Sequence, residues 1–320
     1  MKEADIRPKE LLEKYHELCL KDAQAINHLE FVEIHCPGCS SESSRLKFKK
    51  NGFAYVQCTD CGSLYCSPRP TIEALNRFYE NSQSAQYWAN VFFPAVAEAR
   101  KEKLFRKKAL EISKNLSING NKDELSICDV GAGYGIFLEE LQKVFPDSTL
   151  YAIEPCIELA EICRKKGIST LVSVAEDANE WKDRFDLVIS SEVIEHVFSP
   201  EEFVKSLYNL SRPGGTVIMT GLGYEGFDIL VLQEKSNSIF PPLHINFLSL
   251  DGFEVIFKRA GFNKIEVWTP GVLDVDIVLN SGSAPEFLQV MTKRQNALSD
   301  FQSFLSNHNM SSHVWVIGIK

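Results

Sequence analysis

The sequence lacks the features that mark membrane proteins, exported proteins and strongly basic proteins. No stretch approaches the ~18 consecutive apolar residues that a membrane-spanning helix needs, and the residues after Met1 do not form a charged-then-apolar secretory signal. The formal net charge is −9, which disfavours a protein that binds nucleic acid mainly by releasing counterions. We therefore expect a cytoplasmic protein with no membrane span.

The sequence also lacks the even set of cysteines that a disulfide framework requires. It has nine cysteines in 320 residues, and four of them form two C-x-x-C pairs, which favours metal binding together with reduced thiols. Hydrophobic residues make up 44% of the chain, enough to bury a substantial core. No internal repeat or low-complexity stretch is present.

The distribution of apolar, charged and turn-forming residues along the sequence predicts four regions. Apolar residues recur at helical spacing near the N-terminus, then short strand-like and turn-like stretches surround the C-x-x-C pairs, and helical patterns lead into a long α/β segment. The predicted regions are an amphipathic helix within 1–33, a four-cysteine module at 34–70, a helical linker at 71–122 and a large α/β domain at 123–320.

Short apolar runs alternate with helical patterns over residues 125–269. Alternation of this kind predicts a parallel sheet with crossover helices. A helical segment is expected between the last two strands, at about 285–306. The expected strands lie at 126–130, 150–153, 171–174, 185–189, 216–220, 265–268 and 313–319.

The two C-x-x-C pairs predict a zinc site. Their spacing, C-x2-C-x18-C-x2-C, is typical of a tetrahedral site with four thiolate ligands. Such a site has no open position for water or substrate, so we expect a structural zinc ion that stabilises a module too small to fold on its own core. The predicted ligands are Cys36, Cys39, Cys58 and Cys61.

Basic and aromatic residues interleave between the two cysteine pairs, in a pattern that can bind single-stranded nucleic acid. However, residues 1–50 contain nine Lys and Arg against nine Asp and Glu, so no extended basic field surrounds the patch. Alternation of apolar and charged residues is also ordinary for a half-exposed hairpin. The residues concerned are Arg45, Lys47, Phe48, Lys49, Lys50, Phe53 and Tyr55.

A glycine-rich turn follows the first strand of the α/β segment. The sequence from Ile127 to Leu138 runs from a strand through the turn and into a helix, where a doubly wound sheet binds a nucleotide-like ligand. Glycines allow the backbone to approach the ligand closely. Glu154 lies nineteen residues beyond Gly135, at the tip of the second strand, where an acid can accept both ribose hydroxyls. Because Ile136 replaces the last glycine of G-x-G-x-x-G, the pattern disfavours a dinucleotide.

Four motifs in order over about 140 residues resemble class I S-adenosylmethionine (SAM)-dependent methyltransferases. They are Asp129-Val-Gly-Ala-Gly-Tyr-Gly135, Phe185-Asp-Leu-Val-Ile-Ser-Ser-Glu-Val-Ile-Glu-His196-Val, Leu210-Ser-Arg-Pro-Gly-Gly-Thr and Ala260-Gly-Phe262. The resemblance implies a Rossmann-like sheet, parallel with an antiparallel C-terminal strand, joined to a zinc-ribbon-like module and a helical linker. It also implies SAM as cofactor.

The same resemblance implies roles for individual residues. The turn residues lie beside the methionine part of the cofactor, an acid holds the ribose, a second acid after the third strand meets the adenine amine, and a residue ending the fourth strand faces the methyl group. These positions match Asp129, Gly131, Ala132 and Gly133 for methionine, Glu154 for ribose, Glu176 or Asp177 for adenine, and Ser191 for the methyl end.

Methyl transfer to a hydroxyl needs an aligned nucleophile and a group that removes its proton. His244 follows the fifth strand in Pro-Pro-Leu-His-Ile-Asn, where related enzymes build the acceptor pocket, and His196 follows the fourth strand. We predict that both are catalytic; the structural alternatives are a histidine that orders the proline-led loop and one that binds backbone at a helix start. An acceptor loop is expected at 223–248 and a helical insertion at 271–312.

The whole layout resembles bacterial methyltransferases of sugar and surface-polysaccharide biosynthesis, which implies a sugar or nucleotide-sugar acceptor. It is also similar to sugar C-methyltransferases with an N-terminal zinc module. Because this chain ends soon after the core, at Lys320, we expect O- or N-methylation instead. The alternative is an rRNA or tRNA methyltransferase whose zinc module binds RNA.

Overall fold

A seven-stranded mixed sheet forms the centre of the protein. The computed structural model describes residues 1–115 and 124–320, so the last part of the predicted helical linker, 116–122, lies outside the described residues. The strand order is β12-β13-β10-β9-β6-β7-β8; β6 to β10 are parallel, and β13 is antiparallel to both its neighbours. The predicted sheet is therefore confirmed. Its strands are β6 (Ser126–Val130), β7 (Thr149–Ile153), β8 (Ser169–Leu171), β9 (Phe185–Ser191), β10 (Ser211–Leu222), β12 (Lys264–Trp268) and β13 (His313–Ile319).

Two of these strands differ most from the sequence prediction. The third parallel strand is β8, which ends at Leu171, whereas the predicted strand began there. β8 pairs only with β7 in the described sheet, and Val172 and Val174 beyond it are exposed. The prediction followed these apolar residues, and it therefore placed the edge strand too late in the sequence. β10 starts earlier than predicted, at Ser211, and its pairing with β9 shifts register between Ser211 and Thr216.

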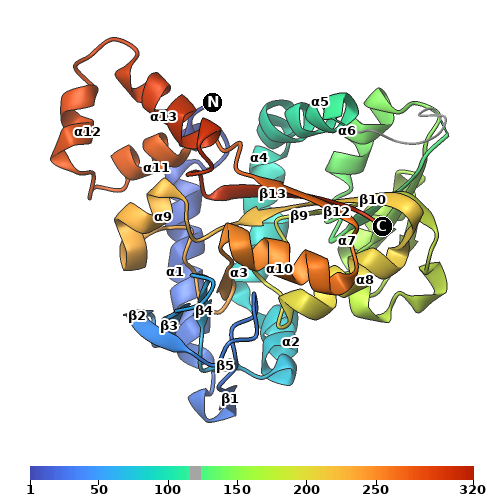
Figure 1. Ribbon diagram of the computed structural model, residues 1–320, viewed down its shortest axis with the longest axis horizontal. Coiled ribbons are helices and arrows are strands. Elements are labelled where there is room, and N and C mark those ends of the chain that lie inside the picture. Colours follow the sequence, from blue (N-terminus) through green and yellow to red (C-terminus); the bar gives the residue numbers. More distant parts are fainter. Residues whose placement is uncertain (116–123) are drawn as a thin grey trace.

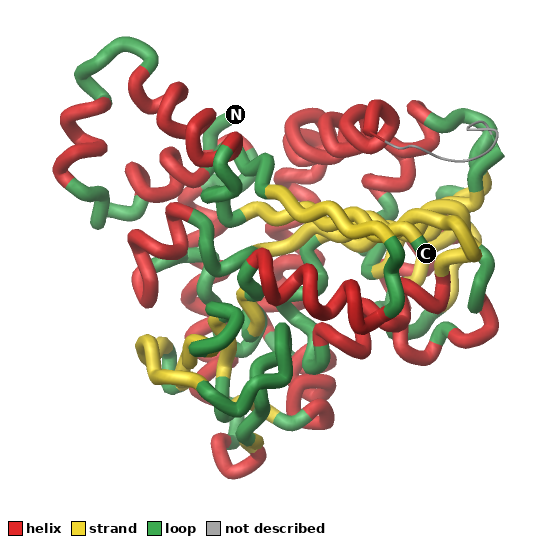
Figure 2. Tube along the Cα trace, in the orientation of Figure 1, coloured by secondary structure: helices red, strands yellow, loops and turns green. Residues whose placement is uncertain are grey.

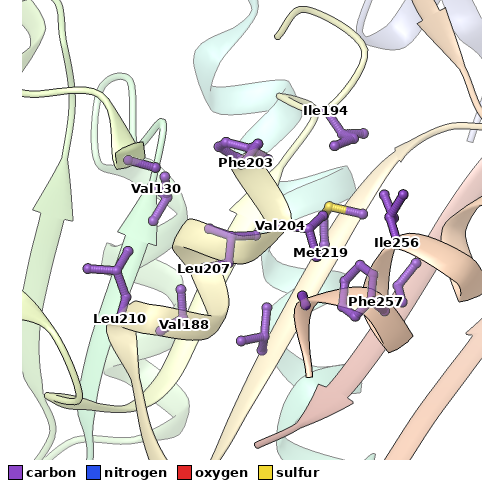
Figure 3. Packing of buried hydrophobic residues seen from close by; sticks show 14 of the residues in the cluster. Val130, Val188, Ile194, Phe203, Val204, Leu207, Leu210, Met219, Ile256 and Phe257 are labelled. Atoms are coloured by element: carbon purple, nitrogen blue, oxygen red, sulfur yellow. The ribbon is translucent and has the colours of Figure 1, made fainter. Parts of the chain in front are cut away.

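Helices cover both faces of the sheet (Figure 1). On one face α8 (Pro200–Leu210) and α10 (Leu250–Ala260) pack side by side. Figure 3 shows Val204 and Leu207 of α8 and Phe257 of α10 near Val188 of β9 and Met219 of β10, all buried. The other face is covered by α5 (Arg106–Asn115), α6 (Ile136–Val144) and α7 (Ile157–Lys165). Each fully buried large apolar side chain contributes roughly 1.5–3 kcal/mol, so these two layers hold the sheet rigid behind its strand ends.

The four-cysteine region forms a second, smaller sheet of order β11-β4-β3-β2. Three of its strands come from the region itself: β2 (Ser44–Lys50), β3 (Phe53–Cys58) and β4 (Leu64–Cys66). The fourth, β11 (Asn246–Phe247), comes from the end of the predicted acceptor loop and pairs with β4. The cysteine region is thus joined through a shared sheet to a loop of the large α/β segment. A separate pair, β1 (Phe31–Val32) and β5 (Arg69–Pro70), closes the base of the region.

The remaining helices lie outside these two layers; some are beside the second sheet and others extend away from the central sheet (Figures 1 and 2). The predicted N-terminal helix is α1 (Lys9–Ala25), shorter than its apolar pattern suggested. It is followed after the cysteine region by α2 (Ile72–Asn81), α3 (Gln83–Tyr87) and α4 (Phe93–Arg100), then later by α9 (Phe227–Leu232), α11 (Asp274–Asn280), α12 (Glu286–Met291) and α13 (Ala297–Asn307). Among the described residues, no helix is both long and apolar enough to cross a membrane.

Candidate functional site: a cofactor loop and two histidines

The glycine-rich turn lies where the strand order reverses, between β6 and β9. An open α/β sheet binds ligands at this point, outside the carboxyl ends of its strands. Gly131 and Gly133 have φ of 78° and 54°, which favours glycine. The Gly131 N–H donates to the Ile153 carbonyl at 2.8 Å, so the turn is tied to β7. A Cβ added at Gly133 would meet nothing within 4 Å, which leaves room beside the turn for a ligand.

Glu154 lies directly against this turn, as its predicted ribose-binding role requires. One carboxylate oxygen accepts from the Gly133 N–H at 2.8 Å and the other from the Cys156 N–H at 2.9 Å. Burial raises the pKa of Glu154, although the two N–H groups act in the opposite direction. Each carboxylate oxygen has a further lone pair, so Glu154 can accept hydrogen bonds from a bound ligand as well.

Asp129 is the next-to-last residue of β6, just before the turn, and has an unsatisfied oxygen. Its Oδ1 is buried and has no hydrogen-bond partner among the described residues. Burial, and then repulsion from Glu154, raise the pKa of Asp129 to about 7. A cationic ligand would relieve both effects. The chemistry of this donor set therefore fits SAM, whose ammonium and sulfonium groups are positive and whose ribose hydroxyls need an acceptor.

Ser191 ends β9 and lies in a polar cluster that the sequence prediction missed. Lys108 Nζ of α5 donates to Ser191 Oγ at 2.9 Å, to Thr220 Oγ1 at 2.9 Å and to Glu192 Oε1 at 3.1 Å. Burial would raise the pKa of Glu192, but His313 and Lys108 outweigh it and hold that pKa well below the usual range. Glu192 has φ of 60°, a strained backbone conformation of the kind that clusters at functional sites. No sequence motif marks Lys108.

His196 and His244 are brought together although 47 residues separate them. Their ring centroids lie 4.7 Å apart in an edge-to-face arrangement, and both side chains are half-buried. Loss of solvation lowers the pKa of His196 to about 3 and that of His244 to about 4, so both imidazoles are neutral at physiological pH. Their catalytic roles stay a prediction.

Glu176 does not join the other predicted residues through any contact in the described chain. It lies after β8 in the short turn Ala175–Asp177 and is exposed. Burial of part of the side chain raises its pKa, and Asp177 and Glu202 add to that effect. Whether Glu176 or Asp177 meets the adenine amine stays a prediction.

The four cysteines of the two C-x-x-C pairs converge at the end of the second sheet, Cys58 in β3 and the other three in loops and turns. Their Sγ atoms all lie within 4.8 Å of one another, and the Cys36–Cys61 and Cys39–Cys58 pairs are each 3.5 Å apart. Four thiolates at the usual Zn–S distance of ~2.3 Å around one ion would be about 3.8 Å apart, so the cluster fits zinc. Gly62 provides the left-handed turn after the second pair, with φ of 82°.

This fold and this loop define a class I methyltransferase, and comparison with known proteins agrees. Residues 97–267, just over half of the chain, match the family model described as "Methyltransferase domain". The chain therefore belongs to this methyltransferase family, and the family implies SAM as the methyl donor.

Two groups of relatives share part of the sequence. The mitochondrial ubiquinone biosynthesis O-methyltransferase of Rattus norvegicus is 31% identical over 106 residues, which cover 30% of this chain and 30% of that protein. Malonyl-[acyl-carrier protein] O-methyltransferase 1 of Ilyobacter polytropus is 25% identical over 149 residues, covering 44% of this chain and 54% of that protein. The chain thus spans from about a third to about half of the length of these relatives.

Solved structures share the fold at low sequence identity. A chain of the complex between the Haloferax volcanii Trm112 methyltransferase activator and a methyltransferase superposes with a TM-score of 0.51 at 14% identity, over 72% of this chain and 95% of that one. The plantazolicin methyltransferase BpumL, in complex with SAH, has a TM-score of 0.51 at 16% identity, over 77% and 93%. These similarities support the fold alone.

Proposed function

We propose that the chain transfers the methyl group of SAM to an oxygen or nitrogen atom of a sugar, nucleotide sugar or related small molecule. The observation that carries the proposal is that two half-buried histidines lie against each other, one of them five residues after β9, while the turn after the neighbouring strand β6 has a chemistry that fits SAM. A neutral imidazole can take part in removing a proton from an acceptor hydroxyl or amine.

In this proposal each predicted residue has one task. Asp129, Gly131, Ala132 and Gly133 bind the methionine part of SAM, Glu154 binds the ribose, Glu176 the adenine amine, and Ser191 borders the methyl group. The sulfonium already activates the methyl carbon, so the protein mainly aligns the acceptor with it. His196 and His244 lie on the acceptor side and assist its deprotonation.

We further propose that Cys36, Cys39, Cys58 and Cys61 hold a structural zinc ion that fixes the acceptor side of the site. Three contacts support this. Tyr55 of β3 donates to the His244 carbonyl at 2.6 Å, Arg259 of α10 donates to the Cys39 carbonyl at 2.9 Å, and the Ser249 N–H at the start of α10 donates to Ser63 Oγ at 2.9 Å. A change in the cysteine module would therefore reach both α10 and the loop that carries His244.

The RNA alternative has less support from the basic patch. Lys50 Nζ donates to the Ser236 carbonyl at 2.7 Å and lies over the Phe240 ring, and burial lowers its pKa to about 8. Phe48 packs against Tyr55 instead of offering a free stacking face. Lys50 and Phe48, two of the residues proposed to bind RNA, therefore make contacts within the protein instead.

Labelled methyl transfer tests the proposal. The protein is incubated with methyl-labelled SAM and either total RNA or a small-molecule extract rich in nucleotide sugars. We expect label in the small-molecule pool and, at low SAM concentration, much less label with Glu154→Ala. The exposed Glu158→Ala, four residues further on, should retain the activity. Label in RNA would overturn the sugar proposal and favour the RNA alternative.

A further inference from the structure

A third side chain joins the two histidines at the acceptor side of the site. Glu195 comes directly before His196, and one ligand atom from each of Glu195, His196 and His244 lies within 4.8 Å of the others. Glu195 is only 2% exposed, and its Oε2 has no hydrogen-bond partner among the described residues. A buried carboxylate oxygen without a partner is costly, and it favours either a proton or a cation.

Among the described residues, the hydrogen bonds of each histidine leave one of its ring nitrogens without a partner. His196 Nδ1 lies 3.0 Å from the Leu243 carbonyl and His244 Nδ1 lies 2.6 Å from the Ser238 carbonyl. A carbonyl only accepts, so each Nδ1 must carry the proton, and the lone pair of each neutral ring is then on Nε2. Metal-binding histidines are oriented in this way, by a backbone acceptor on the nitrogen that does not bind the ion.

The two segments that carry these side chains are held together by the backbone. The Ile245 N–H donates to the Glu195 carbonyl at 2.9 Å. Asn246 Nδ2 donates to the carbonyls of Ile194, at 3.2 Å, and Val197, at 2.7 Å. The segment after β9 and the segment before β11 therefore form one preorganised unit, as a metal site requires.

We propose that Glu195, His196 and His244 bind a divalent first-row metal ion, a second metal site distinct from the four cysteines. Two imidazoles and one carboxylate are a known ligand set for Zn²⁺ and Fe²⁺ sites that keep open positions for water or substrate. The binding of the ion does not depend on the proposed function. Its role rests on that function: the ion would hold the acceptor oxygen and lower the pKa of its hydroxyl.

Mn²⁺ is the probe for this site. Among first-row divalent ions Mn²⁺ binds most weakly, and thiolates prefer softer ions, so it will not displace zinc from the cysteine cluster. The zinc-loaded protein is titrated with Mn²⁺, and the free ion is followed by its electron paramagnetic resonance signal. We expect one bound Mn²⁺ per chain, in competition with added Zn²⁺, without SAM or acceptor present.

Variants identify the ligands. His244→Asn keeps a side-chain N–H near the position of Nδ1, and so the bond to Ser238, but removes Nε2; Glu195→Gln keeps the size and removes the charge. Each should weaken Mn²⁺ binding at least tenfold while SAM affinity and thermal unfolding stay near those of the unmodified protein. His35 and Glu202 are exposed, so His35→Asn and Glu202→Gln are matched controls and should bind normally.

Absence of Mn²⁺ binding to the unmodified protein, or equal binding by both ligand variants, would overturn the second metal site. Because these measurements need no turnover, the two proposals fail separately. Bound Mn²⁺ with no label transfer would count against the proposed function alone, whereas label transfer without a second ion would leave the histidines as proton acceptors.

Discussion

Removal of the Arg69 guanidinium should weaken the contacts that join the cysteine module to the predicted acceptor loop, and so lower the free energy of unfolding. Arg69 is 0% exposed and its charge faces carbonyl and amide oxygens. It donates to Cys66 O at 3.0 Å, Phe198 O at 3.0 Å, Asn246 Oδ1 at 2.9 Å and Ile245 O at 3.4 Å. These acceptors belong to β4, to the segment after β9 and to the acceptor loop, so one side chain links all three.

The magnitude follows from counting acceptors that lose a partner. Ile245 O keeps a bond from the Cys66 N–H at 2.9 Å, which leaves three acceptors affected in Arg69→Met. Each unsatisfied buried acceptor costs about 1–3 kcal/mol. Removal of the buried charge also returns its desolvation cost, which is several kcal/mol. We therefore expect a net loss of about 2–4 kcal/mol in the free energy of unfolding.

Urea unfolding followed by circular dichroism measures this loss, with Arg77→Met as the control. Arg77 pairs with Glu30 at 2.7 Å on the surface, and exposed pairs contribute about 0–1 kcal/mol. Arg69→Met should also reduce turnover with little change in SAM affinity, since it moves the His244 loop and not the glycine turn. A loss no larger than that of Arg77→Met would refute the account of the joint.

Three further predictions concern other parts of the site. Removing zinc with a chelator should lower the thermal unfolding temperature and abolish turnover, with both restored by zinc; unchanged unfolding would contradict a structural ion. The pKa of Asp129 in the folded protein is about 7, which exceeds the ordinary ~3.9. Between these two values the folded protein holds a proton that the unfolded chain has lost. The free energy of unfolding should therefore fall as pH rises from ~4 to ~7. Asp129→Asn should flatten that slope in pH-dependent unfolding. Lys108→Met leaves Glu192 without its lysine partner. Because Glu192 is partly exposed, the free energy of unfolding should fall by only about 1–2 kcal/mol. The control Lys107→Met, at an exposed lysine, should lower it by less than about 0.5 kcal/mol in the same assay.

Local patterns were sufficient for the sheet and for the cofactor turn. Strong apolar runs flanked by turns located β6 and β13 to the residue, and a glycine turn with an acid at the next strand tip placed Glu154 beside Gly133. These features depend on residues close in sequence, or on the regular geometry of βα units. β8 was misplaced because this three-residue edge strand contains one apolar residue, Leu171, and so has a weak apolar signal.

Contacts between segments that are distant in the sequence could not be predicted from the sequence. The histidines were found one by one, but their approach to each other depends on β11 joining the cysteine sheet, and two-residue strands carry no pattern. In the sequence, Arg69 and Lys108 resemble ordinary surface cations. In the folded chain Arg69 is buried, and Lys108 donates a hydrogen bond to Glu192. Glu195 stood in the quoted motif without a role, since its burial depends on the neighbouring β10.

The most direct test of the central claim is a calorimetric titration of SAM into the unmodified protein, Glu154→Ala and the control Glu158→Ala. Hydrogen bonds to a charged group contribute about 1.5–3 kcal/mol, so Glu154→Ala should weaken SAM binding by roughly 10- to 100-fold, and Glu158→Ala should not. Failure of the unmodified protein to bind SAM, or equal affinity in all three, would contradict a cofactor site at the turn between β6 and β9.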